Sequence, residues 1–397
     1  MNIDDTQIDA GQNLHYLDNA ATTFPKPPEV LEYMMDFTRR ACVNPGRSTF
    51  DLALEAETVL FTARKKLSEL FNGDDPNRLV FGYNATDALN LVIFGMMRQG
   101  GHVVSTRLEH NSVLRPIAHC EDDFGAEATF VSFDGRGYVD PDDIRKAIRP
   151  DTKLVVMNHG SNVIGTVQPV ADVGTICREA GVTFCVDAAQ TAGMFPIDMK
   201  AMNIDIVAFT GHKSLLGPTG TGGLCVGKDV EIPHSRAGGT GVASAVRRHL
   251  DMYPFRMEYG TPNMSGIAGL LEGVRYIERM GGVEKVRAHE MELARPLWEC
   301  LRDTEGITLY CADSMENRTP VFSFNIEGFN DPAEIGARLD VDYEVACRTG
   351  LQCAPLVHET IGTAPDGTVR LSLGPMSTEA DVQAAIPAVK ELAAEKR

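Results

Sequence analysis

The chain has 397 residues, a length that predicts about two domains because single hydrophobic cores stop growing below this size. Its composition, 43% hydrophobic and 23% charged, is ordinary for a globular protein. A formal net charge of -18 disfavours nucleic acid as a partner, because an acidic surface repels phosphate groups. No segment approaches the roughly 20 consecutive apolar residues of a membrane span, and the polar N-terminus lacks the features of a signal peptide. We therefore expect a cytoplasmic protein that does not bind membranes.

The cysteines are nine in number and scattered, without CxxC pairs. An odd number without paired spacing predicts neither a disulfide framework nor a zinc ribbon. We therefore expect reduced thiols and no metal site. Any cysteine with a chemical role must then be identified from its context.

Helices and strands alternate through the first part of the chain. Apolar residues follow helical spacing from Leu52 to Phe71 and again from Asp87 to Met97. Short apolar runs typical of strands lie at 78–81, 102–105, 128–133, 153–157, 182–186, 204–209 and 223–226. This alternation predicts an α/β fold with a mostly parallel sheet covered by helices on both faces. In such sheets ligands bind at the carboxyl ends of the strands.

The pattern changes after about residue 265. We expect helices at 266–280, 283–302 and 377–396, a helix that begins near 331, and strands at 319–326, 342–347 and 368–373. This part is typical of a smaller α+β domain. The predicted division is an N-terminal segment 1–25, a large domain 26–265 and a small C-terminal domain 266–397.

Two residues at predicted strand ends indicate a chemical site. Lys213 follows the apolar run 204–209 within FTGHKSLLGPTGTGGLCVG, and a partly desolvated lysine amine can form a Schiff base with an aldehyde. If the aldehyde is pyridoxal phosphate, it also needs an acid at its pyridine nitrogen, an anion site and a flat group on its ring. Asp187 ends the neighbouring strand and could supply the acid. Gln190 could hydrogen-bond the ring hydroxyl.

Further residues could complete such a site. Ala85 and Thr86 open a predicted helix, whose N-terminal amides suit a phosphate. Thr210 and His212 flank the lysine and could add donors, and the imidazole of His110 could stack on the ring. The rival interpretation is a nucleotide site, but neither GxxxxGK[ST] nor a GxGxxG turn occurs here.

Several motifs resemble the class V aminotransferase family, and within it the cysteine desulfurases and selenocysteine lyases. They are YLDNAATT (16–23), VDAAQTAG (186–193), TGHKSLLGPTGTGGL (210–224) and EYGTPN (258–263). The resemblance extends from about residue 16 to 380. It implies a fold-type I transferase dependent on pyridoxal 5'-phosphate (PLP), with a seven-stranded type of sheet. It also implies a homodimer with active sites at the subunit interface.

The resemblance also implies roles for individual residues. Cofactor binding falls to Lys213, Asp187, Gln190, His110, Ala85, Thr86, Thr210, His212 and Asn162, with Thr261 donated by the neighbouring subunit. Substrate binding falls to Arg370, Arg348, Asn162 and Ala21. A guanidinium suits an amino-acid carboxylate because it can form two parallel hydrogen bonds.

The reaction depends on Cys353, within CRTGLQCAP. By resemblance this thiol takes sulfur from L-cysteine as a persulfide and leaves L-alanine, with Lys213 and His110 moving protons. Relatives often carry histidines before the cysteine, whereas this chain has Leu351 and Gln352, so activation must come from elsewhere; Arg348 and His358 are candidates.

The short separation of Cys353 from Arg370 resembles the short-loop desulfurases and suggests that a sulfur-acceptor protein docks close by. Three alternatives stay open: a selenocysteine lyase, a class V aminotransferase acting on a small amino acid, and a non-enzymatic scaffold.

Overall fold

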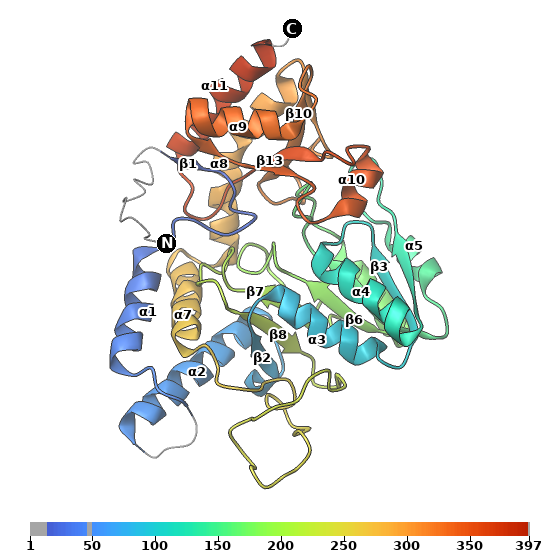
Figure 1. The fold of residues 1–397 in the computed structure, drawn as a ribbon, viewed down its shortest axis with the longest axis vertical. Helices are drawn as coiled ribbons and strands as arrows, with labels where there is room; N and C mark the ends of the chain where they lie inside the picture. Colours follow the sequence, from blue (N-terminus) through green and yellow to red (C-terminus); the bar gives the residue numbers. More distant parts are fainter. Residues whose placement is uncertain (1–13, 46–49, 396–397) are drawn as a thin grey trace, which may run out of the picture.

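The structure is a computed structural model that describes residues 14–45 and 50–395. Its larger part is built on a seven-stranded sheet in the order β2–β8–β7–β6–β5–β3–β4 (Figure 1). The strands are β2 (Leu79–Gly82), β3 (Gly101–Thr106), β4 (Ala126–Val131), β5 (Thr152–Asn158), β6 (Thr183–Asp187), β7 (Ile206–Thr210) and β8 (Gly222–Val226). β8 runs antiparallel to both of its neighbours, β2 and β7, whereas the other neighbouring pairs are parallel, so the predicted mostly parallel sheet is confirmed.

Helices cover both faces of this sheet, as the long apolar strands predict. Successive residues point to opposite sides: Val103 and Leu154 join one core, whereas Val104 and Val155 join the other. The first core includes residues of α3 (Ala85–Met97) and α4 (Asn111–Phe124). The second includes residues of α1 (Pro28–Arg40), α2 (Asp51–Leu70), α5 (Pro141–Ala147), α6 (Val170–Ala180) and α7 (Met264–Arg279).

The C-terminal part is a four-stranded antiparallel sheet with helices packed on it, in the upper half of Figure 1. Its strand order is β12 (Arg348–Gly350), β13 (Thr368–Ser372), β10 (Val321–Ile326) and β9 (Ile307–Leu309). Its helices are α8 (Val283–Asp303), α9 (Pro332–Tyr343) and α11 (Glu379–Glu395). A short helix, α10 (Pro355–Ile361), contacts the larger part, because Arg107 donates to Thr360 Oγ1 (2.9 Å) and to Glu359 Oε2 (2.7 Å). The expected smaller α+β unit is therefore present.

One expected strand is partly wrong. Of the range 342–347, only β11 (Val345–Ala346) is a strand, because Asp342 and Tyr343 still belong to α9. The helix ends at Glu344, whose φ of 56° is left-handed. An apolar residue next to a helix end resembles a strand in the sequence, and only the turn at Glu344 separates the two elements.

The N-terminal segment connects the two parts. Its strand β1 (His15–Tyr16) pairs in parallel with β11, and Leu17 is fully buried in the C-terminal core. The backbone of Asp18 then forms an isolated parallel β-bridge with Ser372 of β13. The expected unit 1–25 therefore crosses from one part to the other; residues 1–13 lie outside the described residues.

Helix α8 also crosses between the two cores. Val286 near its start packs in the core of the large sheet, whereas Leu297 and Trp298 pack in the C-terminal core. Helix α7, just after the predicted boundary at 265/266, packs against α1 and α2. We therefore propose α8 as the connection between the domains. Within the described residues, no helix combines the length and apolar character needed to cross a membrane.

Replacing Leu17 by Ala is expected to lower the free energy of unfolding by about 2–5 kcal/mol, because it opens a cavity in a closed core. Urea unfolding of the two proteins measures this. The matched control is Leu14→Ala, whose side chain is 41% exposed and should change stability by about 0.5 kcal/mol or less. Equal losses for the two variants would show that the segment contributes no packing.

Candidate active site

A cavity of about 230 Å³ lies at the carboxyl ends of the central strands. Twelve of the residues singled out from the sequence line it: Ala21, Ala85, Thr86, His110, Asn162, Asp187, Gln190, Thr210, His212, Lys213, Arg348 and Arg370. Cys353 and Thr261 are not among its lining residues. Residues separated by more than 300 positions are thus brought to one site.

Glycines let the loop after β7 fold tightly around Lys213. The amide of Gly211 donates to the carbonyl of Thr221 (2.8 Å), and that of Gly217 donates to the carbonyl of Gly211 (2.8 Å). A Cβ added at Gly222 would lie 2.6 Å from the Cα of Asn84, the residue that caps α3. Close backbone packing therefore joins the lysine loop to the start of α3.

Burial makes the protonated, charged form of the Lys213 amine less stable. Desolvation lowers the pKa of its amine to about 8, and the guanidiniums of Arg370 and Arg348 act in the same direction. Asp187 opposes this effect, and its own pKa is raised by burial. The amide of Ala189 donates to Asp187 Oδ1 (2.9 Å) and stabilises the carboxylate. The site thus holds, beside a buried acid, an amine that loses its proton more readily than an exposed lysine does.

The start of α3 suits an anion. Asn84 caps the helix by accepting from the amide of Asp87 (2.9 Å), whereas the amides of Ala85 and Thr86 have no carbonyl partner within the helix. Thr210 Oγ1 is buried and has no hydrogen-bond partner among the described residues. Free amides at a helix N-terminus and an unpaired buried hydroxyl fit the phosphate of PLP.

Both histidines of the cavity are neutral near pH 7. Burial lowers the pKa of His110 to about 4, with Lys213 and Arg348 contributing. His110 caps α4, because its Nδ1 accepts from the amide of Ser112 (3.0 Å). This bond places the ring proton on Nε2. Burial likewise lowers the pKa of His212 to about 4.

The N-terminal segment closes one side of the cavity, and part of it was not foreseen. Gln190 Nε2 donates to the carbonyl of Ala20 (3.0 Å). The carbonyl of His212 accepts from the amide of Thr23 (3.0 Å) and from Lys26 Nζ (2.6 Å). Burial lowers the pKa of Lys26 to about 8. The YLDNAATT motif therefore contacts the lysine loop through its backbone and through Thr22 Oγ1, which donates to the carbonyl of His212 (3.1 Å).

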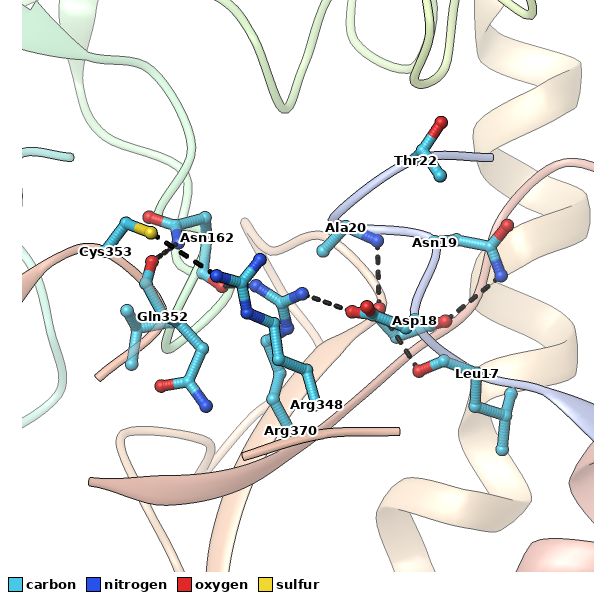
Figure 2. A network of polar contacts seen from close by, with 12 residues as sticks. Leu17, Asp18, Asn19, Ala20, Thr22, Asn162, Arg348, Gln352, Cys353 and Arg370 are labelled. Atoms are coloured by element: carbon cyan, nitrogen blue, oxygen red, sulfur yellow. Dashed lines mark hydrogen bonds and ion pairs between the residues drawn. The ribbon is translucent and has the colours of Figure 1, made fainter. Parts of the chain in front are cut away.

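Arg370 is 1% exposed and has two partners (Figure 2). Its Nη1 donates to the carbonyl of Asn162 (2.9 Å), and its Nη2 forms an ion pair with Asp18. Arg348 lies directly opposite Arg370 on the neighbouring strand. The sequence analysis missed Asp18, because nothing near it in the chain indicates a partner so far away.

Cys353 lies beside the cavity on a tightly held loop. Both Gln352 (φ 42°) and Cys353 (φ 60°) are left-handed, a conformation that costs energy for residues other than glycine. Asn162 Nδ2 donates to the carbonyl of Gln352 (2.7 Å), and the amide of Asn111 donates to the carbonyl of Cys353 (2.7 Å). These contacts stabilise the strained turn that presents the thiol.

Of the two groups considered for activating this thiol, only one touches it. Arg348 Nη2 lies 3.3 Å from Cys353 Sγ (Figure 2). His358 instead contacts Gln352 Oε1 (2.9 Å), and burial lowers its pKa to about 4. Gln352, which stands where relatives often have a histidine, therefore binds a histidine supplied from α10.

A second unforeseen group is the buried carboxyl of Glu109, which precedes His110. Its Oε1 accepts from Thr106 Oγ1 (2.6 Å) and from the amide of Asn158 (3.0 Å). Burial raises the pKa of Glu109 to about 8. Its position next to a predicted strand end was the only signal in the sequence.

Thr261 lies elsewhere. It is exposed and lines a separate cavity together with Arg64, Tyr253 and Glu258. The expectation that it reaches the cofactor of a neighbouring subunit remains a prediction.

A lysine amine and a buried carboxyl lie at adjacent strand ends, with an anion site opposite, and this arrangement is typical of the fold-type I class of enzymes. The chain belongs to the Aminotransferase class-V family, whose model matches residues 15–385. Enzymes of this family depend on PLP in general.

Individual relatives match almost the whole chain. A probable cysteine desulfurase from Methanothermobacter thermautotrophicus is 33% identical over 384 residues, which cover 95% of this chain and 94% of that protein. The apo cysteine desulfurase of Thermococcus onnurineus NA1 has a TM-score of 0.89 at 31% identity, covering 96% of this chain and 95% of that one. The cysteine desulfurase CsdA of Escherichia coli, in an S-sulfonic acid form, has a TM-score of 0.83 at 28% identity, covering 96% and 95%.

The lowered pKa of Lys213 predicts how stability depends on pH in the cofactor-free protein. Burial makes the charged amine unfavourable in the folded protein. The resulting loss of stability is complete below the folded pKa of about 8 and disappears as the pH rises toward the unfolded pKa of 10.5. Lys213→Met should therefore be more stable than the wild type at pH 7, and the difference should shrink toward pH 10. Urea unfolding at several pH values measures it. The exposed Lys65→Met is the control, and a difference independent of pH would contradict the prediction.

Proposed function

We propose that this protein is a PLP-dependent cysteine desulfurase, which converts L-cysteine to L-alanine and takes the sulfur on Cys353 as a persulfide. The observation that carries this function is the contact of Cys353 Sγ with Arg348, at the edge of the cavity that contains Lys213. The relatives named as cysteine desulfurases cover nearly the whole chain and support the same activity.

The residues that would hold the cofactor are those of the cavity floor. The amine of Lys213 would bind the aldehyde, Asp187 the pyridine nitrogen and Gln190 the ring oxygen. His110 would lie on the ring, and the start of α3 with Thr210 and His212 would bind the phosphate. When bound, PLP supplies an electron sink that stabilises negative charge at the substrate Cα.

The substrate would lie between the cofactor residues and the two arginines. Arg370 binds its carboxylate, with Arg348, Asn162 and Ala21 completing the pocket. Lys213 takes the α-proton on its Nζ, which a pKa near 8 allows at neutral pH because the amine accepts and returns protons readily. His110 carries a proton on Nε2 and can deliver it into the cavity.

Sulfur transfer needs a thiolate at Cys353. Arg348 Nη2 lies 3.3 Å from Cys353 Sγ and can donate a hydrogen bond to the sulfur. The thiolate forms a bond to the substrate sulfur while the carbon–sulfur bond breaks. The bonding electrons pass to the carbon fragment, which is protonated and leaves as alanine. The products are alanine and a persulfide on Cys353, so no outside oxidant is required.

Several further features belong to the same proposal. The protein acts as a homodimer to which Thr261 contributes from the partner subunit, and it works in the cytoplasm. A sulfur-acceptor protein docks near Cys353, since the tightly held loop cannot carry a persulfide far.

The decisive experiment incubates the PLP-loaded protein with L-cysteine and dithiothreitol and quantifies alanine and sulfide together. Equal yields over many turnovers are expected. Cys353→Ala should retain the visible absorption of bound PLP but release sulfide more slowly than the wild type, by a factor of about a hundred or more. The reason is that the substrate sulfur then has no acceptor thiol. The control is Cys42→Ala, which removes an exposed thiol and should leave the rate unchanged.

Two results would contradict the proposal. Undiminished sulfide release by Cys353→Ala would refute the role of this thiol. No alanine from L-cysteine, despite bound PLP, would favour the alternatives: alanine formed from selenocysteine indicates a selenocysteine lyase, and amino transfer to a 2-oxo acid indicates an aminotransferase.

A further inference from the structure

The register of two strands places like charges side by side. Arg348 of β12 pairs directly with Arg370 of β13, so the two side chains lie on the same face of the sheet. Figure 2 shows the two guanidiniums next to each other. Like charges directly opposite in a sheet are unfavourable, and burial of Arg370 makes the repulsion stronger than it would be in water. Such a pair needs a compensating anion.

Asp18 provides one negative charge and no more. Its carboxylate forms an ion pair with Arg370 Nη2, and its backbone is fixed by the bridge to Ser372. Burial lowers the pKa of Arg370, and Asp18 opposes that shift. The anion is therefore built into the N-terminal segment next to the cavity.

The charges around the substrate position can be counted. Arg348 and Arg370 contribute two positive charges and Asp18 one negative charge, which leaves one positive charge while Cys353 is a thiol. On the cofactor side, Lys213 and Asp187 have opposite charges. Arg348, Arg370 and Asp18 are thus balanced by a ligand with a single carboxylate, and a second acidic group would find no further positive charge among these three residues.

We propose that Asp18 determines substrate specificity by charge, restricting the site to amino acids with one carboxylate and an uncharged side chain. This deepens the proposed function, on which it rests, because L-cysteine belongs to that class. A residue that only holds Arg370 in place would affect all amino acids equally. A residue that sets the charge balance must instead change the discrimination between acidic and neutral side chains.

L-aspartate and L-asparagine test this distinction, because they share one shape and differ by one charge. Calorimetric titration of the PLP-loaded protein gives a dissociation constant for each. The wild type should bind asparagine more tightly. In Asp18→Asn, the ratio of the two dissociation constants should change by about tenfold or more in favour of aspartate binding. An unchanged ratio would overturn the proposal.

Two further variants keep the test decisive. Asp122→Asn removes the same charge from an exposed position on α4 and should leave the ratio unchanged. Arg348→Gln removes a positive charge and should change the ratio of dissociation constants in favour of asparagine binding. The double variant Asp18→Asn with Arg348→Gln restores the net charge at the substrate position. It should therefore return the ratio of dissociation constants close to the wild-type value. Shifts of both single variants in the same direction would refute the charge balance, even if Asp18→Asn folds poorly.

Failure of the proposed function can be separated from failure of this inference. If the wild type forms no alanine from L-cysteine, the desulfurase is refuted, yet the binding ratios still report the charge balance. If alanine forms but Asp18→Asn leaves the ratio unchanged, the desulfurase stands and Asp18 is structural only.

Discussion

The arrangement of this molecule depends on how one buried guanidinium is stabilised. Arg370 is almost fully enclosed, and a buried charge is costly unless it is paired and hydrogen-bonded. Its partners come from two other segments, Asp18 of the N-terminal segment and the carbonyl of Asn162 in the large part. One side chain on a C-terminal strand therefore couples three regions of the chain, and the cavity forms where they meet.

The same low-dielectric setting gives the cavity its chemistry. Desolvation moves the pKa of Lys213 down to about 8 and that of Asp187 up, because burial disfavours the charged form of each group. It also keeps His110 uncharged near pH 7, as its proposed place against the ring of PLP would require. The two arginines therefore concentrate positive charge on the side of the cavity where the proposed function puts the substrate carboxylate.

Cys353 lies at the border between the two parts. Its loop contacts the large part through Asn162 and Asn111, whereas its sulfur contacts Arg348 of the C-terminal sheet. Asn162 bonds both the cysteine loop, through its side chain, and Arg370, through its carbonyl. The positions of Arg370 and of the cysteine loop are thus linked through one residue.

The sequence by itself was sufficient for the features that depend on local patterns. The seven strands of the sheet and the lysine loop follow from apolar runs and glycine spacing, and the sequence identified twelve of the residues that line the cavity. Local patterns failed where elements adjoin, as at 342–347, where α9 continues to Tyr343. Only the tertiary structure showed that Asp18 pairs with Arg370, that Arg348 rather than His358 touches Cys353, and that Lys26 reaches the carbonyl of His212. These contacts join residues from separate segments, and their geometry depends on how the segments pack together.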